Sequence, residues 1–393
     1  MANSQKMRNS EHTQNTIRAA KRIVVKFGTR VLVDRNGRPN PTRMRKLVHE
    51  IAALHKAGKE VVLVSSGAIG AGLEALHIKK RPSNLPDLQM AAAVGQSRLM
   101  NRYAEMFAAE GCQIGQVLLT HDDLKQRTRH LNARNTLLAL LRNNVIPIVN
   151  ENDVISVDEI ALGDNDELAA LVTILIDGDV LALMTSVDGL RAPATNNRTK
   201  RVPYLAQVDQ KALDLVFGSD CSLSTGGMAT KLAAARSVNK IGALALIADG
   251  RKPSHIGEAM AGEDRGTLIG RVTQDGQKAQ SKRKNWIAFF HKPQGAVVID
   301  DGAGKAILQH GKSLLPIGVK KVEGDFPKGA VLQIKNRKNH VIAQGLTDYS
   351  SDQVKIIKGK KTKDIAALLD GDYYDEVIHR DNMAILEKEN EST

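Results

Sequence analysis

The chain has 393 residues, of which 42% are hydrophobic and 25% charged, the composition of a folded globular protein with room for two or three domains. Its two cysteines, Cys112 and Cys221, exclude a disulfide framework and a multi-cysteine zinc site. No apolar run approaches the roughly 18 residues of a membrane span. Residues 1–19 are polar and lack the apolar core of a secretory signal. We therefore expect a cytoplasmic protein with a flexible N-terminal extension over 1–19.

Short apolar segments alternate with longer helical patterns over residues 20–275. The apolar segments are nearly continuous in Val, Ile and Leu, as expected for strands covered on both faces. They are Arg22–Phe27, Glu60–Ser65, Gly115–Thr120, Val145–Asn150, Asp179–Thr185 and Ala243–Ala248. The helical patterns are Pro41–Ala57, Pro86–Ala109, Leu131–Asn143, Glu167–Ile176 and Met228–Lys240. This alternation predicts a doubly wound α/β domain with a mostly parallel sheet, whose ligands bind beyond the carboxyl ends of the strands.

The pattern changes after a polar, basic linker over 276–284. Residues 285–372 contain short apolar runs separated by glycine turns, which predict a compact β-rich module. An acidic tail follows over 373–393. Residues 282–363 hold 17 Lys or Arg against 6 Asp or Glu, whereas 364–393 hold 2 against 9. This basic excess, within a formal net charge of +13, is consistent with RNA binding and equally with a solvated surface.

Small and basic residues follow the first two predicted strands. Lys26 ends the first strand beside Gly28, where a lysine can reach a phosphate. The alternative is a lysine whose stem packs on apolar surface at a sheet edge. Ser66 and Gly67 follow the second strand, where small residues let backbone N–H groups approach an anion. Tight packing of helix on strand explains these small residues equally well.

Two polar runs follow the strand Val145–Asn150 and precede a helix. They are Glu151-Asn152-Asp153 and Gly163-Asp164-Asn165-Asp166. Carboxylates there can orient lysines, bind an amino group or hold Mg²⁺, and asparagine can bond a substrate carboxylate. Helix capping by Asp164 or Asn165 explains one residue of the set, but not both runs together. The eleven histidines show no metal-ligand spacing, so no side chain is predicted as a metal ligand.

The run Thr225–Lys231 combines a glycine pair with a lysine ahead of an alanine-rich helical pattern. Glycines allow a sharp turn, and the start of a helix presents unpaired N–H groups that suit a phosphate. The spacing is not that of a Walker A loop. An ordinary glycine turn ahead of a surface helix, with Lys231 in solvent, is the alternative.

Taken together, these sequence motifs resemble those of the glutamate 5-kinase family. The matching strings fall in the family's order over about 20–270. They are Val-Val-Lys-Phe-Gly-Thr at 24–29, Val-Ser-Ser-Gly-Ala-Ile at 64–69, Leu-Asn-Ala-Arg-Asn-Thr at 131–136, Pro-Ile-Val-Asn-Glu-Asn-Asp at 147–153, Gly-Asp-Asn-Asp at 163–166 and Thr-Gly-Gly-Met-Ala-Thr-Lys at 225–231. The module over 285–372 looks like the PUA domain that many members carry. The resemblance implies an amino acid kinase α/β/α sandwich with a mostly parallel sheet, followed by a small β-rich PUA-like barrel.

The resemblance also implies ATP-dependent phosphorylation of the γ-carboxylate of L-glutamate, the first step of proline biosynthesis, with Mg²⁺ bridging the phosphates. Lys26 and Lys231 would flank the transferred phosphoryl group, and Asp166 would hold both lysines in place. The positions that match the family's glutamate contacts are Ser66, Asp153 and Asn165. Those that match nucleotide contacts or supply backbone donors are Lys26, Gly28, Gly67, Thr185, Ser186, Thr225, Gly226, Gly227, Met228, Ala229, Thr230 and Lys231.

One segment departs from the family pattern. Many members carry an acid directly after the threonine that corresponds to Thr185, where this chain has Ser186. Asp188 is a candidate substitute, and the backbone alone is another. The resemblance further implies inhibition by proline and a dimer or tetramer.

Two other functions stay open at this point. One is a kinase of the same fold that acts on acetylglutamate, carbamate, aspartate or a nucleotide. The other is an RNA-binding protein that acts through the C-terminal module, where Trp286, Phe289 and Phe290 would stack on bases, although aromatics at strand spacing more often belong to a core. A third interpretation keeps the kinase and makes this module a regulatory or oligomerisation element.

Overall fold

The computed structural model describes residues 15–34, 38–155, 165–194, 198–217, 225–270, 293–369 and 374–386. The chain forms two compact units, Met1–Gln277 and Lys278–Thr393. The predicted N-terminal extension, the linker and the aromatic run at 286–290 lie largely or wholly outside the described residues, as do Cys221, Asp164 and the end of the acidic tail over 387–393.

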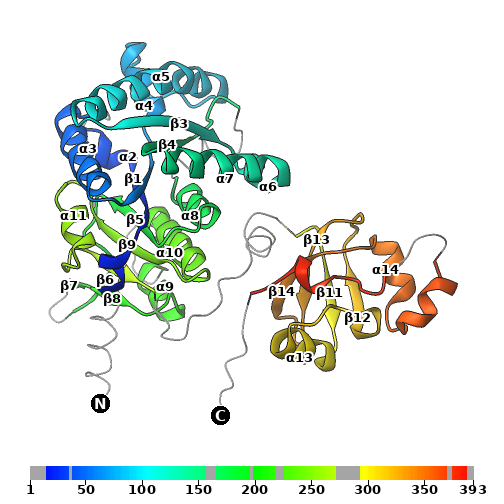
Figure 1. Cartoon of the computed structure of the whole chain (residues 1–393). Coiled ribbons are helices and arrows are strands. Elements are labelled where there is room, and N and C mark those ends of the chain that lie inside the picture. The colour runs from blue at the N-terminus through cyan, green and yellow to red at the C-terminus, as the bar shows by residue number, and fades with distance from the viewer. Residues whose placement is uncertain are drawn as a thin grey trace. The chain divides into compact units, whose positions relative to one another are not determined.

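An eight-stranded sheet forms the centre of the first unit (Figure 1). Its strand order is β3-β4-β2-β1-β5-β9-β10-β8, and the pairs are parallel except β9 with β10. The strands are β1 (Arg22–Phe27), β2 (Glu60–Val64), β3 (Gln113–Leu119), β4 (Val145–Glu151), β5 (Val180–Thr185), β8 (Tyr204–Leu205), β9 (Leu244–Asp249) and β10 (Thr267–Ile269). A separate hairpin pairs β6 (Arg191–Pro193) with β7 (Thr199–Arg201). The predicted doubly wound α/β architecture is confirmed.

Helices cover both faces of this sheet (Figure 1). They are α2 (Thr29–Leu32), α3 (Pro41–Lys56), α4 (Ala68–Ala75), α5 (Leu85–Ala109), α6 (His121–Lys125), α7 (Arg127–Arg142), α8 (Asp166–Leu175), α9 (Gln210–Phe217), α10 (Thr225–Asn239) and α11 (His255–Met260). Apolar side chains of α3, α5 and α11 share one core cluster with the sheet. The helices α8 and α10 pack on each other and against β1, β5 and β9. They form the layer on the opposite face of the sheet.

Strand periodicity decides which side chains meet α8 and α10. In β1 the core cluster under α3 and α5 contains Ile23, Val25 and Phe27. Because successive side chains of a strand point to opposite faces, Lys26 must point toward α8 and α10. A lysine within an otherwise apolar strand is thereby aimed into the second layer, at the carboxyl end of the sheet.

Close contact between α4 and α5 fixes the segment that follows β2. A Cβ atom added at Gly95 would lie 1.8 Å from the carbonyl oxygen of Ala68, and one added at Gly72 would lie 1.8 Å from that of Ala91. The two helix backbones therefore touch at Gly72 and Gly95, because glycine has no Cβ atom to keep them apart. This contact holds the start of α4, and with it the Ser66-Gly67 turn, against the long helix α5.

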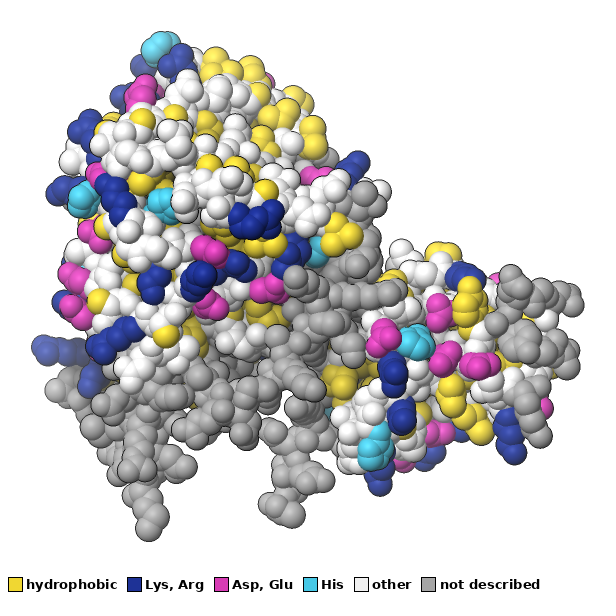
Figure 2. All heavy atoms as spheres, in the orientation of Figure 1, with side chains coloured by type: hydrophobic (Ala, Val, Ile, Leu, Met, Phe, Trp, Pro, Cys, Tyr) yellow, Lys and Arg dark blue, Asp and Glu magenta, His cyan; other side chains and the backbone are white. Residues whose placement is uncertain are grey.

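The second unit is built around a five-stranded sheet with the order β12-β11-β13-β14-β15. Its elements are β11 (Gly295–Ile299), α13 (Asp301–His310), β12 (Val319–Glu323), β13 (Val331–Lys335), β14 (Val341–Leu346), α14 (Ser351–Ile357) and β15 (Met383–Ile385). The unit has its own apolar core. Acidic and basic side chains are interspersed over the face of this unit drawn in Figure 2. The predicted β-rich C-terminal module is confirmed.

No helix among the described residues is long and apolar enough to cross a membrane.

The contact between α4 and α5 makes a prediction about stability. Gly95→Ala places a methyl group against the Ala68 carbonyl, so the two helices must separate. We expect the free energy of unfolding of the first unit to fall by about 1–3 kcal/mol, measured by urea unfolding followed by circular dichroism. Gly304→Ala in α13 is the matched control, because an added Cβ there meets no atom within 4 Å. It should be neutral or stabilising by up to about 1 kcal/mol. A Gly95→Ala protein of wild-type stability would contradict the close approach.

Candidate active site

Two buried lysines and one buried aspartate meet beyond the carboxyl end of β1. The Nζ atom of Lys26 donates to Oδ1 of Asp166 at 2.7 Å, and Nζ of Lys231 donates to Oδ2 at 2.8 Å. Lys26, Asp166 and Lys231 are 1%, 0% and 7% exposed, respectively. Their side chains come from β1, α8 and α10, which are far apart in sequence. Each carboxylate oxygen thus holds one ammonium group, and the cluster keeps a net positive charge.

Asp166 begins α8, so the positive end of the helix dipole adds to the two lysines in stabilising its carboxylate. Thr230 also donates its hydroxyl to Oδ2 of Asp166 at 3.0 Å. Lys231 makes a second hydrogen bond, to the carbonyl oxygen of Gly227 at 3.0 Å. The hydrogen bonds of Thr230 and Lys231 tie the first two turns of α10 to the start of α8.

The glycine pair of the run 225–231 lies inside the helix. α10 begins at Thr225, so Gly226 and Gly227 belong to its first turn and Lys231 is its seventh residue. The expectation of a glycine turn ahead of the helix is therefore wrong, and so is the alternative that left Lys231 in solvent, because Lys231 is buried. The first four N–H groups of a helix have no partner within it. Among the described residues they belong to the segment from Thr225 to Met228, so the run still offers backbone donors beside the lysine pair.

Asn165 has a role that differs from capping. It stands at the N-cap position of α8, but its side chain makes no cap hydrogen bond. Its Nδ2 atom instead donates to the carbonyl oxygen of Ser65 at 2.7 Å and to Oδ1 of Asn150 at 2.8 Å. Asn150 in turn donates to Oε1 of Gln96 on α5 at 2.8 Å. This chain of amides connects α5, β4, β2 and α8. Sequence reasoning missed Asn150 and Gln96.

The turn after β2 presents an unpaired hydroxyl. Ser66 is 6% exposed, and its Oγ atom has no hydrogen-bond partner among the described residues. Gly67 follows with a φ of 97°, a left-handed conformation that favours glycine, and it begins α4. The hydroxyl groups of Ser65 and Tyr103 share a hydrogen bond of 2.9 Å, and burial raises the pKa of Tyr103. The turn is thereby fixed while the Ser66 hydroxyl is left for a ligand.

Acidic side chains follow β4 at the same edge of the sheet. Glu151 is buried, and Asp153 is half-buried in the turn after the strand. The Nδ1 atom of His121 lies 3.9 Å from Glu151, and its Nε2 atom lies 3.6 Å from Glu167. Residues 156–164, which include Gly163 and Asp164, lie outside the described part of the chain.

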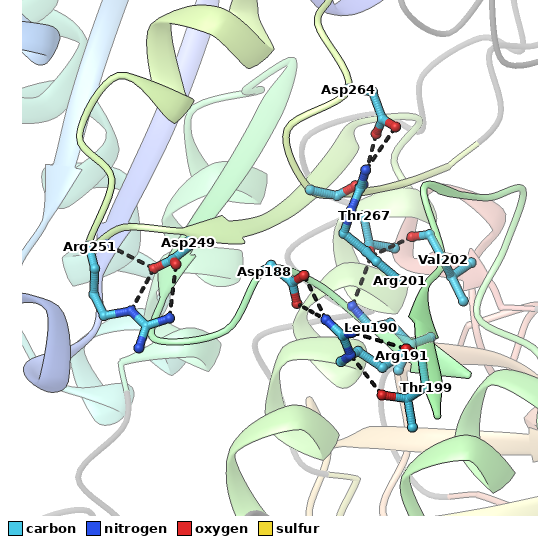
Figure 3. A network of polar contacts seen from close by, with 11 residues as sticks. Asp188, Leu190, Arg191, Thr199, Arg201, Val202, Asp249, Arg251, Asp264 and Thr267 are labelled. Atoms are coloured by element: carbon cyan, nitrogen blue, oxygen red, sulfur yellow. Dashed lines mark hydrogen bonds and ion pairs between the residues drawn. The ribbon is translucent and has the colours of Figure 1, made fainter. Parts of the chain in front are cut away.

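The end of β5 carries a second polar network, drawn in Figure 3. Thr185 ends the strand and pairs in register with Asp249 at the end of β9. Asp188, one candidate substitute for the missing acid, binds Arg191 with N–O distances of 2.9 and 2.7 Å. Asp249 binds Arg251. Sequence reasoning did not identify Asp249, which directly follows the predicted strand Ala243–Ala248 and ends the observed strand β9.

The described side chains offer a metal ion few protein ligands. Within the described ranges, no three His, Cys, Asp or Glu side chains are grouped so that they could hold a metal. The central carboxylate, Asp166, is occupied by two lysines. Mg²⁺ commonly keeps several waters and binds substrate phosphates with few protein ligands, so this arrangement is compatible with the ion.

Comparison with known proteins agrees with this geometry. Residues 21–249 match the amino acid kinase family, and residues 295–369 match the PUA domain. A protein of Geobacter sulfurreducens named glutamate 5-kinase is 44% identical over 368 residues, which cover 93% of this chain and 98% of that one. A Moorella thermoacetica protein of the same name is 43% identical, covering 93% of this chain and 97% of that one.

The charge cluster makes a prediction about stability. Asp166→Asn leaves two buried ammonium groups without their counter-charge, so we expect the free energy of unfolding to fall by about 3–5 kcal/mol. Adding Lys26→Met to Asp166→Asn removes one uncompensated charge and should recover part of this loss. Urea unfolding of both single variants and the double variant measures the coupling. Additive losses would show that the cluster is not held together by charge.

Proposed function

We propose, because the chain belongs to the glutamate 5-kinase group of the amino acid kinase family, that it transfers the γ-phosphoryl group of ATP to the γ-carboxylate of L-glutamate. The products are ADP and γ-glutamyl phosphate, which begins proline biosynthesis. The observation that carries the proposal for the site is the pair of buried lysines on Asp166, next to the start of α10. Such a site binds and stabilises clustered negative charge.

Transfer of a phosphoryl group to a carboxylate requires positioning and charge stabilisation more than acid–base chemistry. A carboxylate oxygen of the substrate attacks the γ-phosphorus, and the bond to the β–γ bridging oxygen breaks. The substrate is already ionised, so a general base is not needed. Lys26 and Lys231 stabilise the charge that develops on the transferred group and on ADP. Asp166 positions both ammonium groups.

The glutamate side of the site is assigned to Ser66, Asp153 and Asn165. The Ser66 hydroxyl is buried and unpaired among the described residues, so it is available to a ligand. Asp153 supplies a carboxylate for the substrate ammonium group. Asn165 is held in a fixed orientation by its bonds to Ser65 and Asn150. These three residues lie at the ends of neighbouring strands and at the start of α8.

The nucleotide side is assigned to the end of β5 and the start of α10. Thr185 ends β5 and Ser186 follows it, and Gly28 is the N-cap residue of α2, two residues after Lys26. The N–H groups at the start of α10 suit phosphate oxygens. Mg²⁺, when bound with ATP, neutralises phosphate charge and orients the γ-phosphoryl group. Gly67, Met228, Ala229 and Thr230 complete the proposed nucleotide contacts.

An RNA-binding function has less support from the described surface. In the second unit, Glu323 pairs with Lys321 and Lys335, and Lys355 pairs with Asp325 and Asp352. Part of the basic excess is thus matched locally by acids. RNA binding, proline inhibition and a dimer or tetramer stay predictions of the resemblance.

Substrate specificity tests the proposal directly. With ATP and Mg²⁺, the wild-type protein should release ADP in response to L-glutamate, and added hydroxylamine should trap the acyl phosphate as a hydroxamate. Aspartate, acetylglutamate, carbamate and nucleoside monophosphates should give little turnover. Lys231→Ala should lower kcat by about 10²–10³-fold, because a donor to the developing charge is lost.

Lys46→Ala is the control for that experiment, because Lys46 is exposed on α3, which covers the opposite face of the sheet. It should keep wild-type kcat. Turnover with another acid but not with glutamate would overturn the substrate assignment, and a wild-type rate for Lys231→Ala would remove Lys231 from the mechanism.

The unpaired hydroxyl of Ser66 makes a separate prediction. Ser66→Ala removes a buried polar group that lacks a partner, so stability should be unchanged or slightly higher. If the hydroxyl binds glutamate, KM for glutamate should rise by about tenfold while KM for ATP changes little. Steady-state kinetics and thermal melting measure both effects. A lower melting temperature with unchanged KM for glutamate would show a structural role instead.

A further inference from the structure

Asp249 lies on the same face of the sheet as the catalytic lysine pair. The core cluster on the opposite face contains alternate residues of β9, namely Leu244, Leu246 and Ala248. The alternation of strand side chains therefore points Asp249 into the layer of α8 and α10. By the same argument Thr185 of β5 points there, because Val180, Ala182 and Met184 belong to the opposite cluster.

The register places Asp249 at a defined separation from Lys26. Lys26 pairs with Leu183 of β5, and Thr185 lies two residues further along and pairs with Asp249 of β9. Two strand spacings of about 4.8 Å and two residues of about 3.3 Å give roughly 12 Å between the Cα atoms of Lys26 and Asp249. The separation runs along the carboxyl edge, in the direction from the phosphate-binding lysine toward the end of β5. A nucleoside would lie in this direction if its γ-phosphate contacts Lys26.

The ionised carboxylate of Asp249 can accept one more hydrogen bond than it accepts in the structure. Its Oδ1 atom accepts the backbone N–H of Arg251 at 3.0 Å and Nε of Arg251 at 2.9 Å, and its Oδ2 atom accepts Nη2 at 2.9 Å. A carboxylate offers about four acceptor positions, so one remains on Oδ2. Burial alone would raise its pKa, but the hydrogen bonds and charge of Arg251 hold the pKa of Asp249 below its ordinary value.

The surroundings of Asp249 fit the nucleoside end of the site. The close-up shows the pair Asp249–Arg251 and the pair Asp188–Arg191 on neighbouring segments at this edge (Figure 3). The hydrogen bonds of Asp249, followed by weaker charge effects that include Asp188, raise the pKa of Arg251. The side chain of Asp188 is 44% exposed and that of Asp249 is 7% exposed. The more buried carboxylate makes the stronger and more selective hydrogen bonds.

We propose that Asp249 binds the ribose of the nucleoside triphosphate by accepting a hydrogen bond from its 2′ or 3′ hydroxyl, and that Arg251 positions the carboxylate. This inference rests on the proposed kinase function. The chain carries no acid directly after Thr185. The acidic contact to the nucleotide would come instead from Asp249 at the end of β9, which pairs with Thr185 in the sheet. Carboxylates recognise ribose hydroxyls in the same way in dinucleotide-binding sheets.

The competing explanation is that the pair of Asp249 and Arg251 stabilises only the turn in which both residues lie. The bond from the Arg251 N–H to Oδ1 of Asp249 is a turn contact between residues two apart, and the ion pair could serve only that turn. Ribose analogues distinguish the two explanations, because a turn contact has no effect on which sugar is bound.

The test measures KM for ATP, 2′-deoxy-ATP and 3′-deoxy-ATP with glutamate as acceptor. In the wild-type protein, loss of the contacted hydroxyl should raise KM for the nucleotide by about tenfold. Asp249→Asn should raise KM for ATP by about tenfold, leave KM for glutamate unchanged and reduce the penalty for the deoxynucleotide to less than about threefold. Arg251→Met keeps the carboxylate but removes the group that positions it, so discrimination between ATP and the deoxynucleotide should weaken without being lost.

Asp264→Asn is the matched control. Asp264 also pairs with an arginine, Arg201, at 2.7 and 2.8 Å, but its side chain is 53% exposed. This variant should behave as wild type toward all three nucleotides.

Equal KM values of the wild-type protein for ATP and both deoxynucleotides would overturn the inference without any variant. An unchanged KM for ATP in Asp249→Asn would also overturn it. The same holds if Asp249→Asn raises KM for ATP and KM for glutamate equally and lowers the melting temperature. These results differ from failure of the proposed function, in which the wild-type protein shows no glutamate-dependent turnover.

Discussion

The carboxylate of Asp166 is the group on which the rest of the site depends. Burying three charged groups is expensive unless they are paired, and here one anion pairs with two cations. The arrangement needs β1 to aim Lys26 into the layer of α8 and α10, and it needs both helices to begin at the same edge. The sheet order, with β5 next to β1 and β9 next to β5, supplies this. The excess positive charge is the reason that such a site suits a phosphoryl group.

Support for this cluster extends to the opposite side of the sheet. The glycine contact between α4 and α5 holds the Ser66-Gly67 turn, and Gln96 of α5 connects through Asn150 to Asn165. Asn165 directly precedes Asp166. A chain of backbone contacts and amide hydrogen bonds therefore links the helix α5 to the residue that anchors both lysines. The two halves of the site are positioned by one continuous set of interactions.

Much of the fold was predictable because parallel strands covered on both faces are nearly continuous apolar runs. The strand Arg22–Phe27 was predicted with its observed bounds, and Lys26 and Asp166 could be placed at one edge. Short elements such as β8 and β10, with two and three residues, carry too little pattern to be detected. The amide chain was missed because contacts between side chains 15 and 54 residues apart leave no local signal. Asp249 was missed because the terminal acid of a strand resembles an ordinary strand end.

The fixed orientation of Asn165 has a consequence for the kind of group that can be recognised there. Both of its N–H bonds are committed to Ser65 and Asn150. The hydrogen-bonding capacity that the amide retains is therefore acceptance by its carbonyl oxygen. An amide in this state attracts donors such as an ammonium group and disfavours carboxylates. Selection at this point of the site is consequently by the polarity of the hydrogen bond, so a group that presents an N–H or O–H donor is favoured over one that presents only acceptors.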